Sequence, residues 1–378
     1  MKIALSGAFW GMDTTGSGQY LHHLLHGLLE LVPAEDCVLF LPRQAPGAAA
    51  VCPCPWEVLP TPLDRLGKNP AKLWFEQRAF PQGCRRQGVD VAHVPYFAPP
   101  CCPTVPTVVT IHDLIPLLLP AYRGGPLVRG YMRLVSWSAR RAALVLTDSH
   151  ASARDIQRLL HIPPSRLRVI PLAADACYRP LAPEAYRPTL ARLGLPVPYM
   201  LYLGGFDRRK NLAGLLAAFA RARVPGISLV IAGRLPAKDS AFAPDPRPIA
   251  QRLGLAGRVH YTGWVAEEDK PALYVGALAF LFPSYYEGFG LPVLEAISCG
   301  TPVVVGRGSA LEEVAGEGGL AVPPDDVGAL AEAITALAND AALRRRLAAQ
   351  GLIHARRFSW QETARRTLAA YREALGAG

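Results

Sequence analysis

Residues 280–305, FLFPSYYEGFGLPVLEAISCGTPVVV, contain the pattern that decides the fold. The apolar run 280–282, ended by a proline, is typical of a buried strand. Pro292 suits the first turn of a helix, because its missing N–H has no partner there, and residues 293–299 continue that helix. A second buried strand follows at 302–305. The order strand, loop, helix and strand predicts one unit of a parallel α/β sheet.

Two carboxylates flank the start of this helix. Glu287 lies in the loop before it, and Glu295 lies inside it. Gly288 and Gly290 would let the backbone approach a ligand closely, and a helix N-terminus offers free N–H groups. Two acids in this arrangement can face one polyhydroxylated ligand, but two solvated acids on a tight loop fit the spacing equally well.

Length and composition narrow the class of protein. A chain of 378 residues favours two domains, and 51% apolar with 19% charged residues indicates an ordered globular protein. The net charge of +10 and the pI of about 9.3 favour anionic partners such as nucleotides, phosphorylated compounds or an acidic membrane surface. Nucleic acid ranks last among them, because the sequence carries no nucleic-acid-binding motif.

The eight cysteines indicate neither a zinc site nor a disulfide framework. The close pairs, Cys52-Pro53-Cys54 and Cys101-Cys102, lack the paired CxxC spacing, and no signal peptide opens the chain. No apolar run has the length needed to span a bilayer. We therefore expect reduced thiols, a cytoplasmic location and membrane contact that is at most peripheral, on the inner face.

The first half begins with a strand, a glycine loop and a helix. A strand at 2–6 is followed by a loop containing Gly16-Ser17-Gly18 and by a helix with leucines on one face. This order can cradle an anion or a sugar. The loop lacks the full GxGxxG fingerprint, which argues against a dinucleotide site.

Two later strands of this half end in polar residues. The strand 108–111 ends in His112-Asp113, and the strand 143–147 ends in Asp148-Ser149. Because ligands gather at the carboxyl ends of strands in open parallel sheets, these are candidate site residues. A histidine that only satisfies a turn is the alternative for the first pair.

Two stretches of the first half are basic. Residues 65–86 carry six cations against Glu76 as the only acid. Residues 123–141 mix arginines with apolar side chains at helical spacing. An interfacial helix on anionic lipid and an ordinary amphipathic helix with a solvated basic face both fit this pattern.

The second half carries a cationic motif after its first strand. The strand 199–203 leads into GGFDRRKN and a helix at 212–222. Three adjacent cations at a helix start oppose the macrodipole, so a bound diphosphate explains Arg208, Arg209 and Lys210 better than a solvated turn does.

Strands and helices alternate in both halves, which predicts two α/β domains with parallel sheets and a ligand cleft between them. We expect residues 42–62 to form a surface loop and 175–198, rich in proline and arginine, to form the interdomain linker. The expected domains are 1–175 and 176–357, with a final helix at 358–378 that packs back on the first domain.

Together these landmarks resemble the retaining nucleotide-sugar glycosyltransferases of the GT-B fold, specifically family 4 (group 1), over nearly the whole chain. EGFGLPVLE followed by AISCGTPVV is highly specific, and YLGGFDRRKNL, GWV, SALEEV and GLAVPPDD occur in the expected order. Around TIHDLIPLLLP and TDSHASARDI the first half resembles the mannosyltransferase-like branch. The resemblance implies two Rossmann-like, doubly wound domains that face each other across a cleft.

The resemblance also implies residue roles. Arg209 and Lys210 would hold the donor diphosphate as the leaving group, and His112 would contact the sugar or phosphate from the first domain. Glu287 would position the donor sugar, and Glu295 would bind the ribose. The further donor contacts implied are Gly16, Gly18, Gly205, Arg208, Gly233, Trp264, Val265, Gly288, Phe289, Gly290 and Leu291, and the acceptor contacts are Asp113, Asp148 and Ser149.

The implied activity is transfer of a hexose, with mannose from GDP-mannose favoured, to a saccharide or lipid-linked saccharide. The resemblance implies that the anomeric configuration is retained by a front-face reaction, in which Glu287 positions the donor sugar and does not attack it. It also implies that the reaction needs no metal and no cofactor beyond the nucleotide sugar. A nucleotide-sugar 2-epimerase of the same fold and a non-catalytic nucleotide-sugar or lipid-binding module remain alternatives, and a dehydrogenase is the weakest. Because Gly205 stands where many members carry Arg, either Arg208 or Arg209 can serve the diphosphate.

Overall fold

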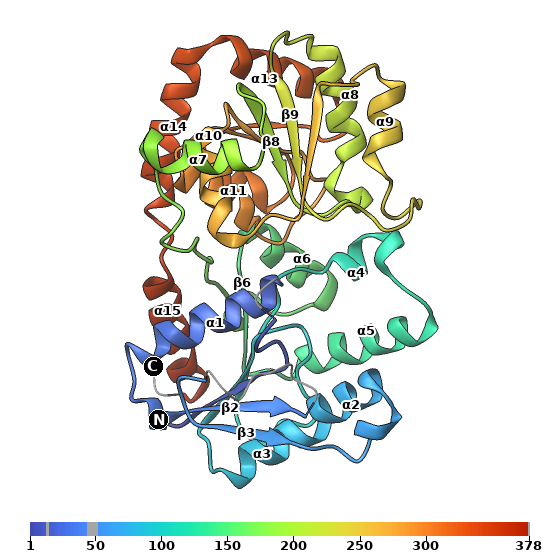
Figure 1. Cartoon of the computed structure of the whole chain (residues 1–378). Helices are drawn as coiled ribbons and strands as arrows, with labels where there is room; N and C mark the ends of the chain where they lie inside the picture. The colour runs from blue at the N-terminus through green and yellow to red at the C-terminus, as the bar shows by residue number, and fades with distance from the viewer. Residues whose placement is uncertain (13–14, 44–51, 377–378) are drawn as a thin grey trace. The chain divides into compact units, whose positions relative to one another are not determined.

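The computed structural model describes residues 1–12, 15–43 and 52–376. The chain divides into two compact units (Figure 1). Unit 1 comprises Met1–Leu172 and Ser359–Gly378, and unit 2 comprises Ala173–Phe358. Each unit contains one parallel sheet with helices packed on it, so the predicted pair of α/β domains is confirmed.

The described strands of unit 1 form a seven-stranded sheet in the order β3-β2-β1-β4-β5-β6-β7, and every neighbouring pair is parallel. Strands of a parallel sheet are buried on both faces, which explains why most of them read as short, continuous apolar runs. They are β1 Ile3–Ser6, β2 Cys37–Pro42, β3 Trp56–Leu59, β4 Val91–Val94, β5 Thr107–Thr110, β6 Leu144–Thr147 and β7 Leu167–Val169.

Hydroxyl side chains start three helices of unit 1. Thr15 accepts a hydrogen bond from the Gly18 amide at α1, and Ser149 and Ser359 do the same for α6 and α15. Figure 1 shows α1 beside α15, although the two helices lie at opposite ends of the chain. The helices of unit 1 are α1 Gly16–Leu29, α2 Lys68–Trp74, α3 Phe80–Arg86, α4 Ile115–Leu118, α5 Pro126–Ala139, α6 His150–Leu160 and α15 Trp360–Ala374.

The described strands of unit 2 form a six-stranded parallel sheet in the order β10-β9-β8-β11-β12-β13. The rings of Tyr199, Tyr202, Phe280 and Phe282 are fully buried around its central strands. The strands are β8 Tyr199–Leu203, β9 Ser228–Ala232, β10 Val259–Gly263, β11 Phe280–Phe282, β12 Val303–Gly306 and β13 Gly319–Val322.

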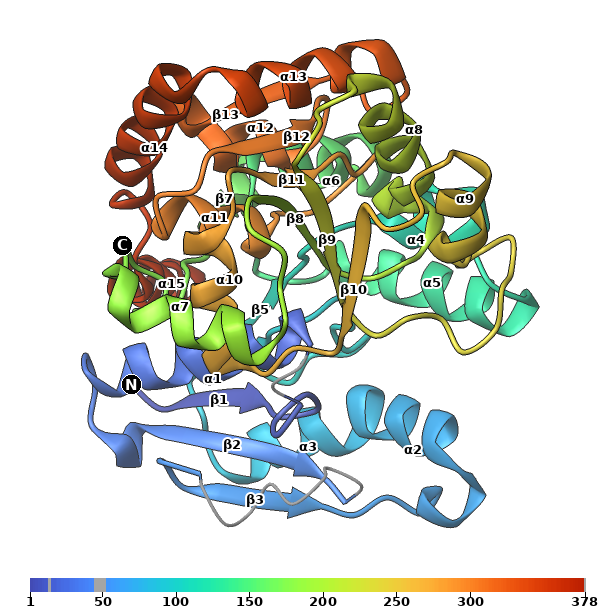
Figure 2. The same cartoon turned by 45° about the horizontal axis from the view of Figure 1, so that its top comes forward.

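Helices cover both faces of this second sheet, and Figure 2 shows α13 lying beside α8. None of the described helices of the chain is long and apolar enough to cross a membrane. The helices of unit 2 are α7 Pro183–Arg192, α8 Leu212–Ala222, α9 Pro246–Arg252, α10 Lys270–Gly276, α11 Leu291–Ser298, α12 Ala310–Ala315, α13 Val327–Asn339 and α14 Ala341–Ala355.

Two predicted irregular segments contain regular structure. The expected surface loop 42–62 holds the edge strand β3, while residues 44–51 of that loop lie outside the described residues. The expected linker 175–198 contains helix α7, which packs on α10 within unit 2. Its composition is misleading because Pro183 occupies the first turn of the helix, where proline is well tolerated.

The last helix is fastened to unit 1 by polar contacts. The Tyr371 hydroxyl lies 2.7 Å from Nδ1 of His93 on β4, and both residues are fully buried. The Thr363 hydroxyl donates to the Pro171 carbonyl oxygen at 2.7 Å, and Glu373 forms an ion pair with Arg168. Buried hydrogen bonds of this kind are costly to leave half made.

Replacing Tyr371 with Phe should therefore lower the free energy of unfolding by about 1–3 kcal/mol, because the buried His93 ring loses a partner. Differential scanning calorimetry should show that unit 1 unfolds at a lower temperature in this variant than in the wild type. Tyr186→Phe, on the half-buried α7 of unit 2, is the matched control. Equal thermal stability of Tyr371→Phe and the wild type would contradict the contribution assigned to this bond.

Candidate active site

The cationic motif of unit 2 forms a turn, not the first turn of a helix. Arg208–Lys210 make a single 3₁₀ turn, and Asn211 adopts a left-handed conformation with φ of 55° before α8 begins. The three cations therefore lie outside the helix they precede. This corrects the expectation that they occupy a helix start, and it removes much of the predicted conflict with the macrodipole.

Glu287 pairs with two of these cations. Its Oε2 lies 2.5 Å from Nη1 of Arg209, and its Oε1 lies 2.7 Å from Nζ of Lys210. Arg209 also donates to the Tyr286 carbonyl oxygen at 2.7 Å, and its Nε lies 3.5 Å from Asp207. The structure thus assembles three of the predicted catalytic residues into one cluster.

Burial and charge act in opposite directions on Glu287. Its side chain is almost fully buried, which by itself raises the pKa of the carboxyl group. The charges of Lys210 and Arg209 outweigh burial, so the pKa of Glu287 lies below its ordinary value. Glu287 is therefore an anion that holds two cations in place, and the lysine keeps donors that can reach a phosphate.

Glycines bring the strand ends of unit 2 close together. Gly233 follows β9 with φ of 143°, and a Cβ there would lie 2.3 Å from the Gly204 carbonyl oxygen. Gly290 precedes α11 with φ of 106°. Only glycine adopts such φ angles readily, so the backbone conformation explains why both of these predicted donor-binding positions are glycines. Gly205 is exposed beside this edge.

Glu295 occupies a second buried cluster on α11. Its Oε2 accepts a hydrogen bond of 2.8 Å from the hydroxyl of Tyr274 on α10. Burial raises the pKa of Glu295 to about 7, although Lys270 and the Tyr274 bond act against that rise. The sequence did not identify Tyr274, because a contact across 21 residues leaves no mark in a local motif.

The remaining predicted donor residues differ in exposure. The Trp264 side chain is 59% exposed, whereas Val265 is buried beside it. Phe289 is also buried, and its ring packs edge-on against Phe358. The Phe289 side chain therefore packs inside the protein and supports the loop between β11 and α11. Gly288 belongs to the same loop, and α11 begins at Leu291.

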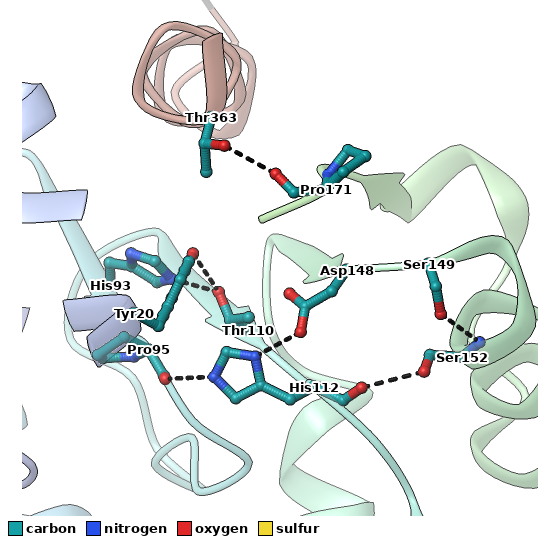
Figure 3. A network of polar contacts seen from close by, with 10 residues as sticks. All are labelled: Tyr20, His93, Pro95, Thr110, His112, Asp148, Ser149, Ser152, Pro171 and Thr363. Carbon is teal, nitrogen blue, oxygen red and sulfur yellow. Dashed lines mark hydrogen bonds and ion pairs between the residues drawn. The ribbon is translucent and has the colours of Figure 1, made fainter. Parts of the chain in front are cut away.

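In unit 1 the predicted residue His112 is paired with Asp148 (Figure 3). Nδ1 of His112 lies 2.7 Å from Oδ2 of Asp148, and Nε2 lies 3.2 Å from the Pro95 carbonyl oxygen. Both partners are acceptors, so the imidazole satisfies both contacts only when both nitrogens carry protons. Burial lowers the pKa of His112, but Asp148 outweighs it and the net pKa is raised.

The other predicted residues of unit 1 have local structural contacts. Asp113 Oδ1 accepts from the Ile115 amide at 2.9 Å, and Ser149 Oγ accepts from the Ser152 amide at 3.0 Å. A Cβ at Gly18 would lie 2.2 Å from the Met12 carbonyl oxygen, whereas Gly16 has open space around it. The predicted contacts of these residues with an acceptor or donor stay predictions.

Comparisons with known proteins identify the family. Residues 193–352 match the family model "Glycosyl transferases group 1", and residues 14–176 match "Glycosyltransferase Family 4". The O-antigen chain mannosyltransferase B of Escherichia coli is 36% identical over 70% of both chains. The MMP alpha-(1->4)-mannosyltransferase of Mycolicibacterium hassiacum is 34% identical over 66% of this chain and 59% of its own length.

Solved structures agree on the fold. The sucrose-phosphate synthase of Thermosynechococcus elongatus superposes over 100% of both chains with a TM-score of 0.79 at 24% identity. Anabaena HepE in complex with UDP gives a TM-score of 0.76 at 20% identity over 99% of this chain. The two units thus define a GT-B protein, and the predicted fold class is confirmed. The chain belongs to the group 1, family 4 glycosyltransferases.

The raised pKa of Glu295 predicts a pH dependence of stability. Between pH 4.5, the ordinary pKa of the group, and about 7, the folded protein holds a proton that the unfolded chain has released. The free energy of unfolding should therefore fall as the pH rises through this window, by up to about 3 kcal/mol from this group. Glu295→Gln should remove that part of the fall in calorimetric scans, whereas the exposed control Glu332→Gln should not. The same pH slope in Glu295→Gln and the wild type would refute the assignment.

Proposed function

We propose that this protein is a retaining, metal-independent mannosyltransferase that uses GDP-mannose to extend a saccharide or lipid-linked saccharide acceptor. The observation that carries the proposal is the cluster of Arg209 and Lys210 on the buried Glu287 carboxylate. Transfer of a glycosyl group requires neutralisation of the charge that develops on the departing diphosphate. Two oriented cations provide this neutralisation without a metal.

The choice of mannose rests on the relatives. One is named an O-antigen chain mannosyltransferase and another an MMP mannosyltransferase, and both exceed 30% identity. The structural neighbour HepE was solved with UDP, at an identity that supports the fold alone. GDP-mannose is the donor to test first, because the first half resembles the mannosyltransferase-like branch, and UDP and ADP sugars serve as comparisons.

The geometry supports separate roles for the acids. Glu287 accepts from both cations, so it acts as their positioning group rather than as a nucleophile. Asp148 is buried against Nδ1 of His112, and we assign it to fixing that ring rather than to contacting the acceptor. The cationic ring of His112 can then stabilise negative charge on the donor. Glu295 is the carboxylate proposed to accept from ribose hydroxyls.

Lys210→Met keeps the ion pair of Glu287 with Arg209 and should lower kcat for transfer from GDP-mannose about 10²–10³-fold, because one preorganised charge on the leaving group is lost. The assay follows GDP release in EDTA with a panel of methyl glycoside acceptors, and NMR of the product reports the anomeric configuration. Arg345→Met, on the exposed face of α14, is the charge-matched control. Transfer with inversion, no transfer from any donor, or an unchanged Lys210→Met rate would contradict the proposal.

We further propose that unit 1 contacts an anionic membrane surface through α5. A groove of about 490 Å³ beside this helix is lined by Arg123, Arg129, Arg133 and Arg140 together with Trp137 and other apolar side chains. Leu127 is 90% exposed and Trp137 is 47% exposed on the same helix. Exposed apolar side chains beside arginines suit the interface of an anionic bilayer. The location proposed is the cytoplasmic face of the membrane.

Arg129→Ser combined with Arg133→Ser should weaken binding to phosphatidylglycerol-containing vesicles about thirtyfold, because each of the two cations near such a surface contributes about 1 kcal/mol. Co-sedimentation at low and high salt measures it, and binding should fall as salt rises. Arg345→Ser with Arg346→Ser, exposed on α14, is the control that should bind normally. Equal binding to neutral vesicles would rule out the electrostatic contact.

A further inference from the structure

A cluster of aromatic and charged side chains lies at the ligand-binding edge of the unit 1 sheet, outside the residues assigned so far. Ser6 ends β1, and its Oγ lies 3.2 Å from the hydroxyl of Tyr96, which follows β4. Tyr96 directly follows Pro95, whose carbonyl oxygen contacts His112. Ligands of parallel sheets bind at the carboxyl ends of the strands, so this cluster adjoins the proposed reaction site of unit 1.

Glu76 reaches this edge from an irregular helical turn. Residues Phe75–Ala79 form a π-helical segment between α2 and α3, and Phe80 N–H bonds to the Phe75 carbonyl oxygen. Pro81 follows Phe80 and has no N–H to donate to the Gln77 carbonyl oxygen. This missing donor explains why the α-helical hydrogen-bond pattern is interrupted here. Such segments are frequent at functional sites. The turn buries Glu76, the only acid in this basic stretch, to 2% exposure.

The Glu76 carboxylate is only half satisfied. Its Oε2 accepts a hydrogen bond of 2.9 Å from the Tyr131 hydroxyl on α5. Its Oε1 has no hydrogen-bond partner among the described residues, and Nζ of Lys72 stands 3.7 Å away. Burial raises the pKa of Glu76 to about 7, although Lys72, Tyr131 and Tyr96 act against it. A buried carboxylate oxygen that accepts no hydrogen bond is costly even with an ammonium group 3.7 Å away, and it requires an explanation.

Three rings surround the same point. Nζ of Lys72 lies 5.7 Å from the ring centroid of Phe9, 5.8 Å from that of Tyr96 and 5.7 Å from that of Tyr131. Phe9 and Tyr131 are half-buried, and the Lys72 side chain is 45% exposed. The long, solvent-accessible side chain of Lys72 therefore covers these three rings and the Glu76 carboxylate.

We propose that Glu76, Tyr131, Tyr96, Phe9 and Lys72 form the subsite for the acceptor sugar, a neutral saccharide ring. Oε1 of Glu76 accepts a hydrogen bond from a sugar hydroxyl, and the aromatic rings pack against the apolar face of the sugar. Lys72 moves aside and donates to a second hydroxyl. This inference rests on the proposed glycosyl transfer and adds the acceptor residues to it.

The charges of the cluster favour a neutral ligand. Glu76 and Lys72 carry opposite charges in contact, so the cluster has no excess positive charge. An anion would meet the Glu76 carboxylate directly, and a cation would compete with Lys72 for the same rings. The arginine-lined groove beside α5 has the opposite character and suits anions. Neutral hydroxyls are the groups that satisfy Oε1 and the ammonium together.

Glu76→Gln tests the subsite, because it preserves the shape and removes the carboxylate. With methyl α-mannopyranoside as the probe acceptor, kcat/KM for the acceptor should fall at least tenfold. The Kd of GDP-mannose and the slow hydrolysis of the donor by water should not change. The acceptor kcat/KM of the wild type should also fall as the pH drops below about 7 and Glu76 is protonated, and this fall should be smaller in Glu76→Gln, where other groups such as Glu295 still titrate.

Two further variants and a binding assay distinguish loss of the subsite from misfolding and from failure of the proposed function. Tyr131→Phe keeps the ring and loses only the bond to Oε2, so it should show a smaller fall in acceptor kcat/KM even if Glu76→Gln does not fold. Glu35→Gln, exposed in the same unit, should behave as the wild type. Saturation-transfer NMR should detect the probe sugar on the wild type and lose the signal in Glu76→Gln. Unchanged acceptor kinetics and NMR signal in both variants would overturn the subsite, whereas a wild type that binds no donor would overturn the proposed function instead.

Discussion

The ion pairs of Glu287 with Arg209 and Lys210 are the constraint on which the active edge of unit 2 depends. A buried carboxylate is costly unless it is paired and hydrogen-bonded, so the loop after β11 and the turn after β8 are stable only together. Their backbones also meet, since the Tyr285 amide donates to the Arg209 carbonyl oxygen at 2.8 Å. The result is a pair of cations whose positions are set before any ligand arrives, and preorganised charge of this kind contributes most to stabilising a developing anion.

Unit 1 uses the same principle with different groups. Asp148 favours the cationic form of His112, while Glu76 is a buried carboxylate with one oxygen that accepts no hydrogen bond. The cation suits a charged part of a donor, and the half-satisfied carboxylate suits the hydroxyls of a neutral sugar. His112 and Asp148 follow the neighbouring strands β5 and β6, and Tyr96, whose ring faces Lys72 beside Glu76, follows β4. The same edge of the sheet therefore offers a cationic ring and a hydrogen-bond-accepting carboxylate. These two groups suit the proposed reaction between an anionic donor and a neutral acceptor.

Sequence patterns were sufficient for the alternation of strands and helices, because buried parallel strands are short apolar runs bounded by glycine and proline. They failed where tertiary contacts overrule composition. Strand β3 at the sheet edge has an exposed Trp56, and α7 begins at a proline, so composition predicts irregular structure for both. The motif residues Arg209, Lys210 and Glu287 were found and do meet. Tyr274 and Tyr131 were missed, because they reach Glu295 and Glu76 across 21 and 55 residues. Glu76 did leave a signal, as the single acid among six cations.

We propose that Arg209 and Lys210 bind the diphosphate of the donor. Calorimetric titration of the wild-type protein with GDP and with GMP, both in EDTA, tests it most directly. The two ligands share the base and ribose and differ only in the second phosphate. We expect GDP to bind at least tenfold more tightly than GMP, a difference of about 1.4 kcal/mol or more, and we expect Lys210→Met to reduce this difference. Equal affinities for GDP and GMP in the wild type would contradict it.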